Sequence, residues 1–188
     1  LKFDDPNSNP YALSDTFLIN SIEASATGID NSGNLKFYSD GEKIWNFKHE
    51  VIFDSLKGAK DATQGVTVFS SNKNDKKFYL ISSNVNIFDE GAFVYTVDFS
   101  INPDGEVGNN PQFLDSSYNT FERVVVIPSD KYDEQWIIVN PRTANGTSYI
   151  IYSFKDGVAT FKERVESPMH RNYNSGYIRA SPDGRFLA

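Results

Sequence analysis

The sequence contains no cysteine, two histidines and one methionine among its 188 residues. Without cysteine the chain can form no disulfide, thiol nucleophile or thiolate metal site. Any Ser-His-Asp triad or histidine metal site would have to use His49 or His170. The longest apolar runs, such as RVVVIP and QWIIVN, are far shorter than the roughly 20 residues of a membrane-spanning helix. We therefore expect no membrane insertion within these residues.

Positive charge is also scarce, because the formal net charge at pH 7 is −7. A nucleic-acid-binding surface needs clustered lysines and arginines that displace the counterions of the phosphate backbone. Here the basic residues are scattered, and the KNDKK stretch at 73–77 is interrupted by an acid. We expect no nucleic-acid partner.

Aromatic residues are plentiful, with fifteen Phe and ten Tyr. Flat and β-branched side chains suit the pleated surface of a sheet. No segment sustains the 3.6-residue period of an amphipathic helix. The sequence therefore predicts an all-β fold.

Two stretches repeat a pattern of apolar strand, polar turn and apolar strand. They are GVTVFSSNKNDKKFYLISS at 65–83 and RVVVIPSDKYDEQWIIVNP at 123–141. The alignment pairs Val66 with Val124, Phe78 with Trp136 and Leu80 with Ile138, each 58 positions apart, and Phe99 with Phe154, 55 positions apart. An Asp-Gly turn follows in both copies, at 104–105 and 156–157. Each repeat is predicted to hold four antiparallel strands.

Four-stranded repeats of this length are typical of a β-propeller, whose blades pack face to face around an axis. The predicted blades are residues 21–53, 63–116 and 121–167, and a further blade opens at 176–188. Because fewer than four blades cannot close a ring, we expect the remaining blades to come from the same or another chain. Residues 1–20 are a candidate closing strand, and exposed apolar residues are expected on the hairpin at 177–188. The alternative is a β-sandwich, which also has many short strands.

The stretch GNLKFYSDGEKIWNFKHEVI resembles the N-terminal propeller region of large exported proteins from gliding Bacteroidetes-type bacteria, which use type IX secretion. The matching positions are Gly33, Asn34, Leu35, Phe37, Tyr38, Asp40, Gly41, Trp45, Asn46 and His49, followed by Thr63, Gln64 and Val66. The resemblance implies a secreted or surface-exposed WD40-like propeller that forms one module of a larger adhesin-like protein. It implies no known reaction.

The segment SDGEKIW partly resembles the Asp-box turn of sialidase-like propellers. In such a turn the aspartate accepts backbone N–H bonds, glycine adopts a positive φ, and tryptophan fills space between blades. We predict these structural roles for Asp40, Gly41 and Trp45.

The segment DNSGN places oxygen atoms at alternate positions, as the start of a calcium loop does. The bidentate glutamate of such a loop is missing, because Gly41 stands at its twelfth position. We therefore predict turn chemistry for Asp30, Ser32 and Asn34 and no cofactor, with calcium left open at this loop.

The loop SPMHRNYNSGY, at 167–177, is the strongest sequence candidate for ligand contact. Loops between propeller blades line one face of the axial channel. We predict His170, Arg171, Tyr173 and Asn174 as ligand-binding residues, against the alternative of a plain surface loop.

No convergent catalytic set stands out, because the arginines and acids show no spacing that forces them together. The sequence therefore favours a non-enzymatic module that binds a protein or glycan. One alternative is a sialidase-like hydrolase on the same fold, since a propeller can host either function. Another is a structural spacer.

Overall fold

A computed structural model describes residues 17–71, 73–84, 91–114, 120–129, 131, 133–143, 146–166, 176–181 and 183–188. In these ranges all regular secondary structure is β-strand, and the prediction of an all-β chain is confirmed. Within the same ranges, no helix is long and apolar enough to span a membrane.

The strands form three antiparallel sheets, each running in chain order. The first sheet consists of β1 (Ala26–Ile29), β2 (Leu35–Ser39), β3 (Ile44–Asn46) and β4 (Val51–Phe53). The second consists of β5 (Val66–Ser70), β6 (Lys77–Ser83), β7 (Ala92–Asp98), β8 (Glu106–Val107) and β9 (Gln112–Leu114). The third consists of β10 (Thr120–Pro128), β11 (Gln135–Thr143), β12 (Gly146–Lys155) and β13 (Val158–Glu166).

The fifth strand of the second sheet does not widen it. Both β8 and β9 pair with β7, β8 beside Val97 and Asp98 and β9 beside Ala92 to Val94. The two short strands therefore follow each other along one edge of β7. Together they occupy the place that β13 fills in the third sheet.

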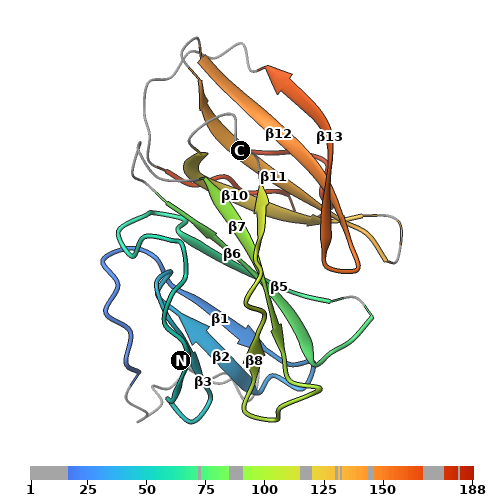
Figure 1. The fold of residues 1–188 in the computed structure, drawn as a ribbon. Helices are drawn as coiled ribbons and strands as arrows, with labels where there is room; N and C mark the ends of the chain where they lie inside the picture. Colours follow the sequence, from blue (N-terminus) through green and yellow to red (C-terminus); the bar gives the residue numbers. More distant parts are fainter. Residues whose placement is uncertain are drawn as a thin grey trace, which may run out of the picture.

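The second sheet lies between the other two (Figure 1). The first strands β1 and β5 contact each other, and so do β5 and β10. At the other end of the sheets, β4 contacts β8, and β9 contacts β13. Corresponding strands of successive sheets therefore face one another.

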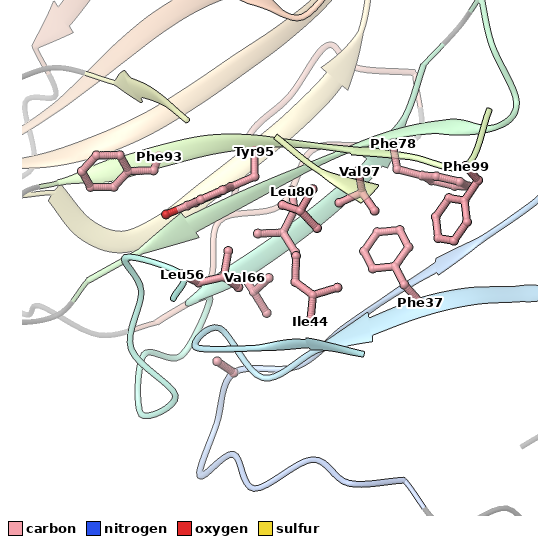
Figure 2. Close-up of a cluster of buried hydrophobic side chains, with 12 residues drawn as sticks. Phe37, Ile44, Leu56, Val66, Phe78, Leu80, Phe93, Tyr95, Val97 and Phe99 are labelled. Carbon is pink, nitrogen blue, oxygen red and sulfur yellow. The ribbon is translucent and has the colours of Figure 1, made fainter. Parts of the chain in front are cut away.

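The core between the first and second sheets is rich in aromatic residues (Figure 2). Its buried residues are Ala24, Phe37, Ile44, Leu56, Val66, Phe78, Leu80, Phe93, Tyr95, Val97, Phe99 and Val107. Phe37 and Phe78 meet edge to face with ring centroids 5.4 Å apart. Such a pair adds about 0.5–1.5 kcal/mol to the free energy gained by burying the rings.

A second core joins the second and third sheets. Its buried residues are Tyr79, Ile81, Ala92, Val94, Leu114, Val124, Ile137, Val139, Ile150, Tyr152, Phe154 and Ala159. On the far face of the third sheet, a smaller cluster contains Ile127, Ile138 and Ile178. The second sheet is thus covered on both faces, and the far face of the third sheet meets the segment around Ile178.

The observed strand pairing corrects the predicted alignment of the repeats. Val68 pairs with Leu80, but the equivalent Val126 pairs with Ile137 rather than Ile138. The second strands are therefore 57 positions apart, not 58, and Phe78 corresponds to Gln135 instead of Trp136. A slip of one residue moves a side chain to the other face of the sheet. Accordingly, Phe78 packs toward the first sheet, whereas Trp136 lies on the far face of the third sheet.

The third strands need a similar correction. Leu80 pairs with Tyr95, and Ile137 pairs with Tyr152. Tyr95 and Tyr152 are therefore equivalent at 57 positions, and the predicted match of Phe99 with Phe154 at 55 positions is wrong. The separation between paired residues of the first two strands is 12 positions from Val68 to Leu80 and 11 positions from Val126 to Ile137, so the offset of 58 between the first strands falls to 57 in the second and third strands.

Candidate functional site

A cavity of about 800 Å³ opens where the first strands of the three sheets converge. Its walls come from β1, β5, β10 and the segment at 177–181. β1, β5 and β10 are edge strands, each paired within its sheet on one side. The volume lies within the roughly 300–1,000 Å³ typical of ligand sites.

One wall is a row of exposed side chains at and before β1. The row consists of Glu23, Ser25, Thr27 and Ile29. Between them, Ala24 and Gly28 are buried and Ala26 is half-buried against the first core. This alternation follows from the two-residue period of extended chain, which sends successive side chains to opposite faces. This row, polar except for Ile29, therefore faces the cavity.

The opposite wall is the segment at 177–181, where Ile178 is buried and Tyr177 and Arg179 are exposed. The Arg179 guanidinium carbon lies 5.6 Å from the centroid of the Tyr177 ring. The Gln64 amide fixes this segment, because its Nε2 donates to the Ile178 carbonyl (3.2 Å) and its Oε1 accepts from the Ile178 N–H (2.7 Å). Side chains of β5 and β10 line the cavity between the two walls.

The charged groups at the cavity are few. Among the described residues that line it, Glu23 is the single acid and Arg179 the single base. The Thr63 hydroxyl donates to Glu23 Oε2 at 2.8 Å. The remaining polar lining is made of hydroxyl and amide groups, which suit a ligand held by neutral hydrogen bonds.

The predicted ligand residues His170, Arg171, Tyr173 and Asn174 lie outside the described residues. Sequence reasoning missed the described cavity residues Glu23, Tyr177 and Arg179. The sequence does indicate that these residues lie in extended segments with one exposed face, because polar and apolar residues alternate in SIEASATGI and GYIRAS. What the alternation does not reveal is that these two distant stretches share one cavity.

Asp40, Gly41 and Trp45 lie in and after the turn that connects β2 and β3. Asp40 Oδ1 accepts from the N–H groups of Glu42 (3.0 Å) and Lys43 (2.8 Å). Gly41 has a φ of 90°, in the left-handed region that glycine tolerates best. These contacts stabilise the turn between β2 and β3.

Trp45 stacks on Tyr38, with centroids 5.4 Å apart, on the face of the first sheet that points away from the second. On this face Tyr38 Oη lies 2.9 Å from His49 Nδ1 and accepts from the Leu18 N–H at 3.3 Å. The Phe17 ring lies 5.0 Å from that of Tyr38. Of the predicted closing strand, residues 1–16 lie outside the described residues, and the part that follows packs on the first sheet.

The calcium candidates Asp30, Ser32 and Asn34 form a turn between β1 and β2. Asp30 Oδ1 accepts from the N–H groups of Ser32 (3.0 Å) and Asn34 (2.9 Å). The hydrogen bond from the Asn34 backbone lowers the pKa of Asp30 below its usual value. Across the described part of the chain, no three His, Asp or Glu residues gather in a way that could hold a metal ion.

No protein family, curated protein or solved structure matches this chain. The resemblance to exported proteins of gliding bacteria therefore stays a prediction.

Proposed function

We propose that the three sheets are consecutive blades of a β-propeller. Each sheet runs in chain order, and its first strand faces the shared cavity, as the inner strands of blades face the axis. A β-sandwich has one core between two sheets. Here the second sheet has a buried cluster on each face, which favours the propeller.

The proposed function is non-enzymatic binding of a protein or glycan at the cavity. The observation that carries it is that one cavity is lined both by the exposed side chains at and before β1 and by Tyr177 and Arg179. A glycosidase needs two carboxyl groups roughly 5–10 Å apart. Glu23 is the single acid among the described lining residues, so the lining favours binding over hydrolysis.

The test is a screen of the chain on glycan and peptide arrays, followed by titration of the best ligand. Replacement of both Tyr177 and Arg179 by Ala should weaken binding at least tenfold, because both side chains line the cavity. The matched control is Ile101→Ala, since Ile101 is an exposed apolar residue outside the lining. Equal affinity of all three proteins would exclude the cavity as the binding site. If the protein turned over a glycosyl or ester substrate and Glu23→Gln abolished that turnover, the proposal of a non-enzymatic binding module would be wrong.

The proposed location is the cell surface or the exterior, as one module of an adhesin-like protein. This proposal rests on the sequence resemblance alone. Protease treatment of intact cells that produce the protein tests it. Digestion of these residues without cell lysis is the expected result, and protection until lysis would contradict it.

A further inference from the structure

Two consecutive residues, Thr63 and Gln64, connect the two walls of the cavity by hydrogen bonds. The Thr63 hydroxyl donates to Glu23 Oε2 at 2.8 Å on one wall. On the other wall, the Gln64 amide bonds both backbone groups of Ile178. These bonds place Glu23 and the segment at 177–181 at the same end of the cavity, and all of these residues line it.

Tyr177 gives this end of the cavity an aromatic surface. The residue is 58% exposed, so apolar ring surface remains for contact with a ligand. The guanidinium carbon of Arg179 lies 5.6 Å from the ring centroid, and the attraction between a cation and an aromatic ring restrains both side chains. An aromatic ring held in this way is a platform on which the C–H groups of a sugar ring can stack, because its face carries partial negative charge.

The polar groups beside this ring complement hydroxyl groups. The Glu23 carboxylate only accepts hydrogen bonds, and the Arg179 guanidinium only donates them. The exposed hydroxyls of Ser25 and Thr27 continue the row that begins at Glu23. A sugar carries several neighbouring hydroxyls that each donate and accept, so one sugar ring can use both kinds of group at once.

The charge and shape of the cavity favour a neutral glycan over other ligands. One carboxylate and one guanidinium among the described lining residues leave no net charge at the site. The formal net charge of the chain is −7, which disfavours the approach of an acidic polysaccharide. A folded protein partner needs a broad contact surface of roughly 800 Å² on each side, whereas a concave site suits a narrow chain of sugar rings.

We propose that the ligand of the cavity is a neutral glycan with one pyranose ring stacked on Tyr177. Hydroxyls of that sugar donate to Glu23 and accept from Arg179. Thr63 is a positioning residue, since its hydroxyl holds the Glu23 carboxylate. This inference rests on the proposed function, because it names the class of ligand that the same cavity binds.

The test is calorimetric titration of the chain with defined oligosaccharides. The neutral probes are cello-, chito- and manno-oligosaccharides. The charged probe is the oligosaccharide of glucuronic acid with the same linkage as the cello-oligosaccharide. We expect one of the neutral probes to bind, and the glucuronic acid probe to bind at least tenfold more weakly than the best neutral one.

Substitutions of Tyr177 test the stacking contact. Tyr177→Ala should weaken binding of the best neutral probe by about tenfold, because it loses both apolar contact area and the aromatic face. Tyr177→Phe keeps the ring and should retain most of the affinity. The matched control is Phe186→Ala, since Phe186 is an aromatic residue of the same segment that is 70% exposed and lies outside the lining. Equal affinity of Tyr177→Ala and the wild type would overturn the inference.

A double-mutant cycle tests the position of the Glu23 carboxylate. Glu23→Ala and Thr63→Val should each weaken binding of the neutral probe. If Thr63 acts through Glu23, then Thr63→Val should cause no further loss in the Glu23→Ala protein, because the two effects are coupled. Independent losses that add would show that Thr63 does not position Glu23.

The same titrations with unstructured peptides separate this inference from the proposed function. If a peptide bound, no neutral oligosaccharide did, and replacement of Tyr177 and Arg179 weakened peptide binding, the cavity would remain the binding site and the glycan would be the wrong ligand. If neither class bound, both proposals would be wrong. Tighter binding of the glucuronic acid probe than of every neutral probe would also overturn the inference.

Discussion

At the scale of single residues, Gly28 of β1 shows how closely the first sheet is packed. A Cβ atom at this position would lie 2.0 Å from Cε1 of Phe37. The Phe37 ring is fully buried and contacts both Phe78 and Phe99. Because the ring is enclosed, it cannot move aside without disturbing the first core.

We therefore expect Gly28→Ala to lower the free energy of unfolding by about 1–3 kcal/mol, as overpacking of a core commonly does. Urea unfolding of the variant measures the change. Gly108→Ala is the matched control, because its Cβ would lie no closer than 3.9 Å to the neighbouring Thr96. An equal effect of the two substitutions would show that Phe37 does not restrict the position.

At the scale of strands, glutamine side chains hold the second sheet to neighbouring segments of backbone. Gln112 of β9 donates to the Ala159 carbonyl of β13 and accepts from the Ala159 N–H, each at 2.7 Å. Gln64 makes the same pair of bonds with Ile178. A glutamine amide can satisfy both polar groups of one backbone residue because it carries a donor and an acceptor side by side.

Gln112→Ala should reduce the free energy of unfolding by about 1–3 kcal/mol, because it leaves the polar groups of Ala159 without their partner. Faster hydrogen exchange of the Ala159 amide is the direct readout. Gln112→Glu keeps the acceptor but loses the donor, so it should slow this exchange relative to Gln112→Ala. Unchanged exchange of the Ala159 amide in Gln112→Ala would show that Gln112 does not protect it.

Ion pairs join the turns of the second and third sheets. Lys73 Nζ lies 2.9 Å from Asp156 Oδ1 and 3.5 Å from Asp133 Oδ2. Lys155 also pairs with Asp133. The hydrogen bond from Lys155 holds the pKa of Asp133 below its usual 3.8.

A lowered carboxyl pKa stabilises the folded state above the unfolded value and loses that effect as the pH falls through the folded value. The wild type should therefore be more stable than Asp133→Asn at pH 6, and the difference should disappear as the pH falls below about 3.8 toward the lowered pKa. Because the pairs are exposed, 0.5 M salt should also reduce the difference at pH 6. Denaturant unfolding across this pH range measures it. A difference that persists at the lowest pH would rule out the ion pairs as its source.

At the scale of the whole molecule, the three sheets differ in how fully they are covered. The second sheet has a buried core on each face, and its strands β6 and β7 have neighbours on both sides. In contrast, most residues of β13 are exposed. In the second sheet, therefore, more contacts must break before the backbone amides are exposed to water.

We expect the slowest hydrogen exchange in β6 and β7 and much faster exchange in β13. Amides in the most buried strands open only with global unfolding, whereas edge strands open locally. Exchange followed by mass spectrometry on peptic fragments distinguishes the strands. Protection of β13 equal to that of β6 would show that this outer strand is covered in solution.

The sequence by itself determined the class of the fold and the approximate places of most strands. Alternating polar and apolar residues, a high aromatic content and Asp-Gly turns are local signals, so the four-strand pattern could be read without coordinates. The structural roles of Asp40 and Gly41 were equally readable, because a turn is made by neighbouring residues.

Only the tertiary structure decided the register of the repeats and the composition of the cavity. The separation between paired residues of the first two strands is one position shorter in the third sheet than in the second, which moves Trp136 to the opposite face from Phe78, and no local pattern reveals that shift. Likewise, Gln64 and Ile178 are 114 positions apart, yet their hydrogen bonds bring Tyr177 and Arg179 to the cavity that β1 also lines. Contacts between distant segments depend on how whole sheets pack, and that packing cannot be read from any short stretch of sequence.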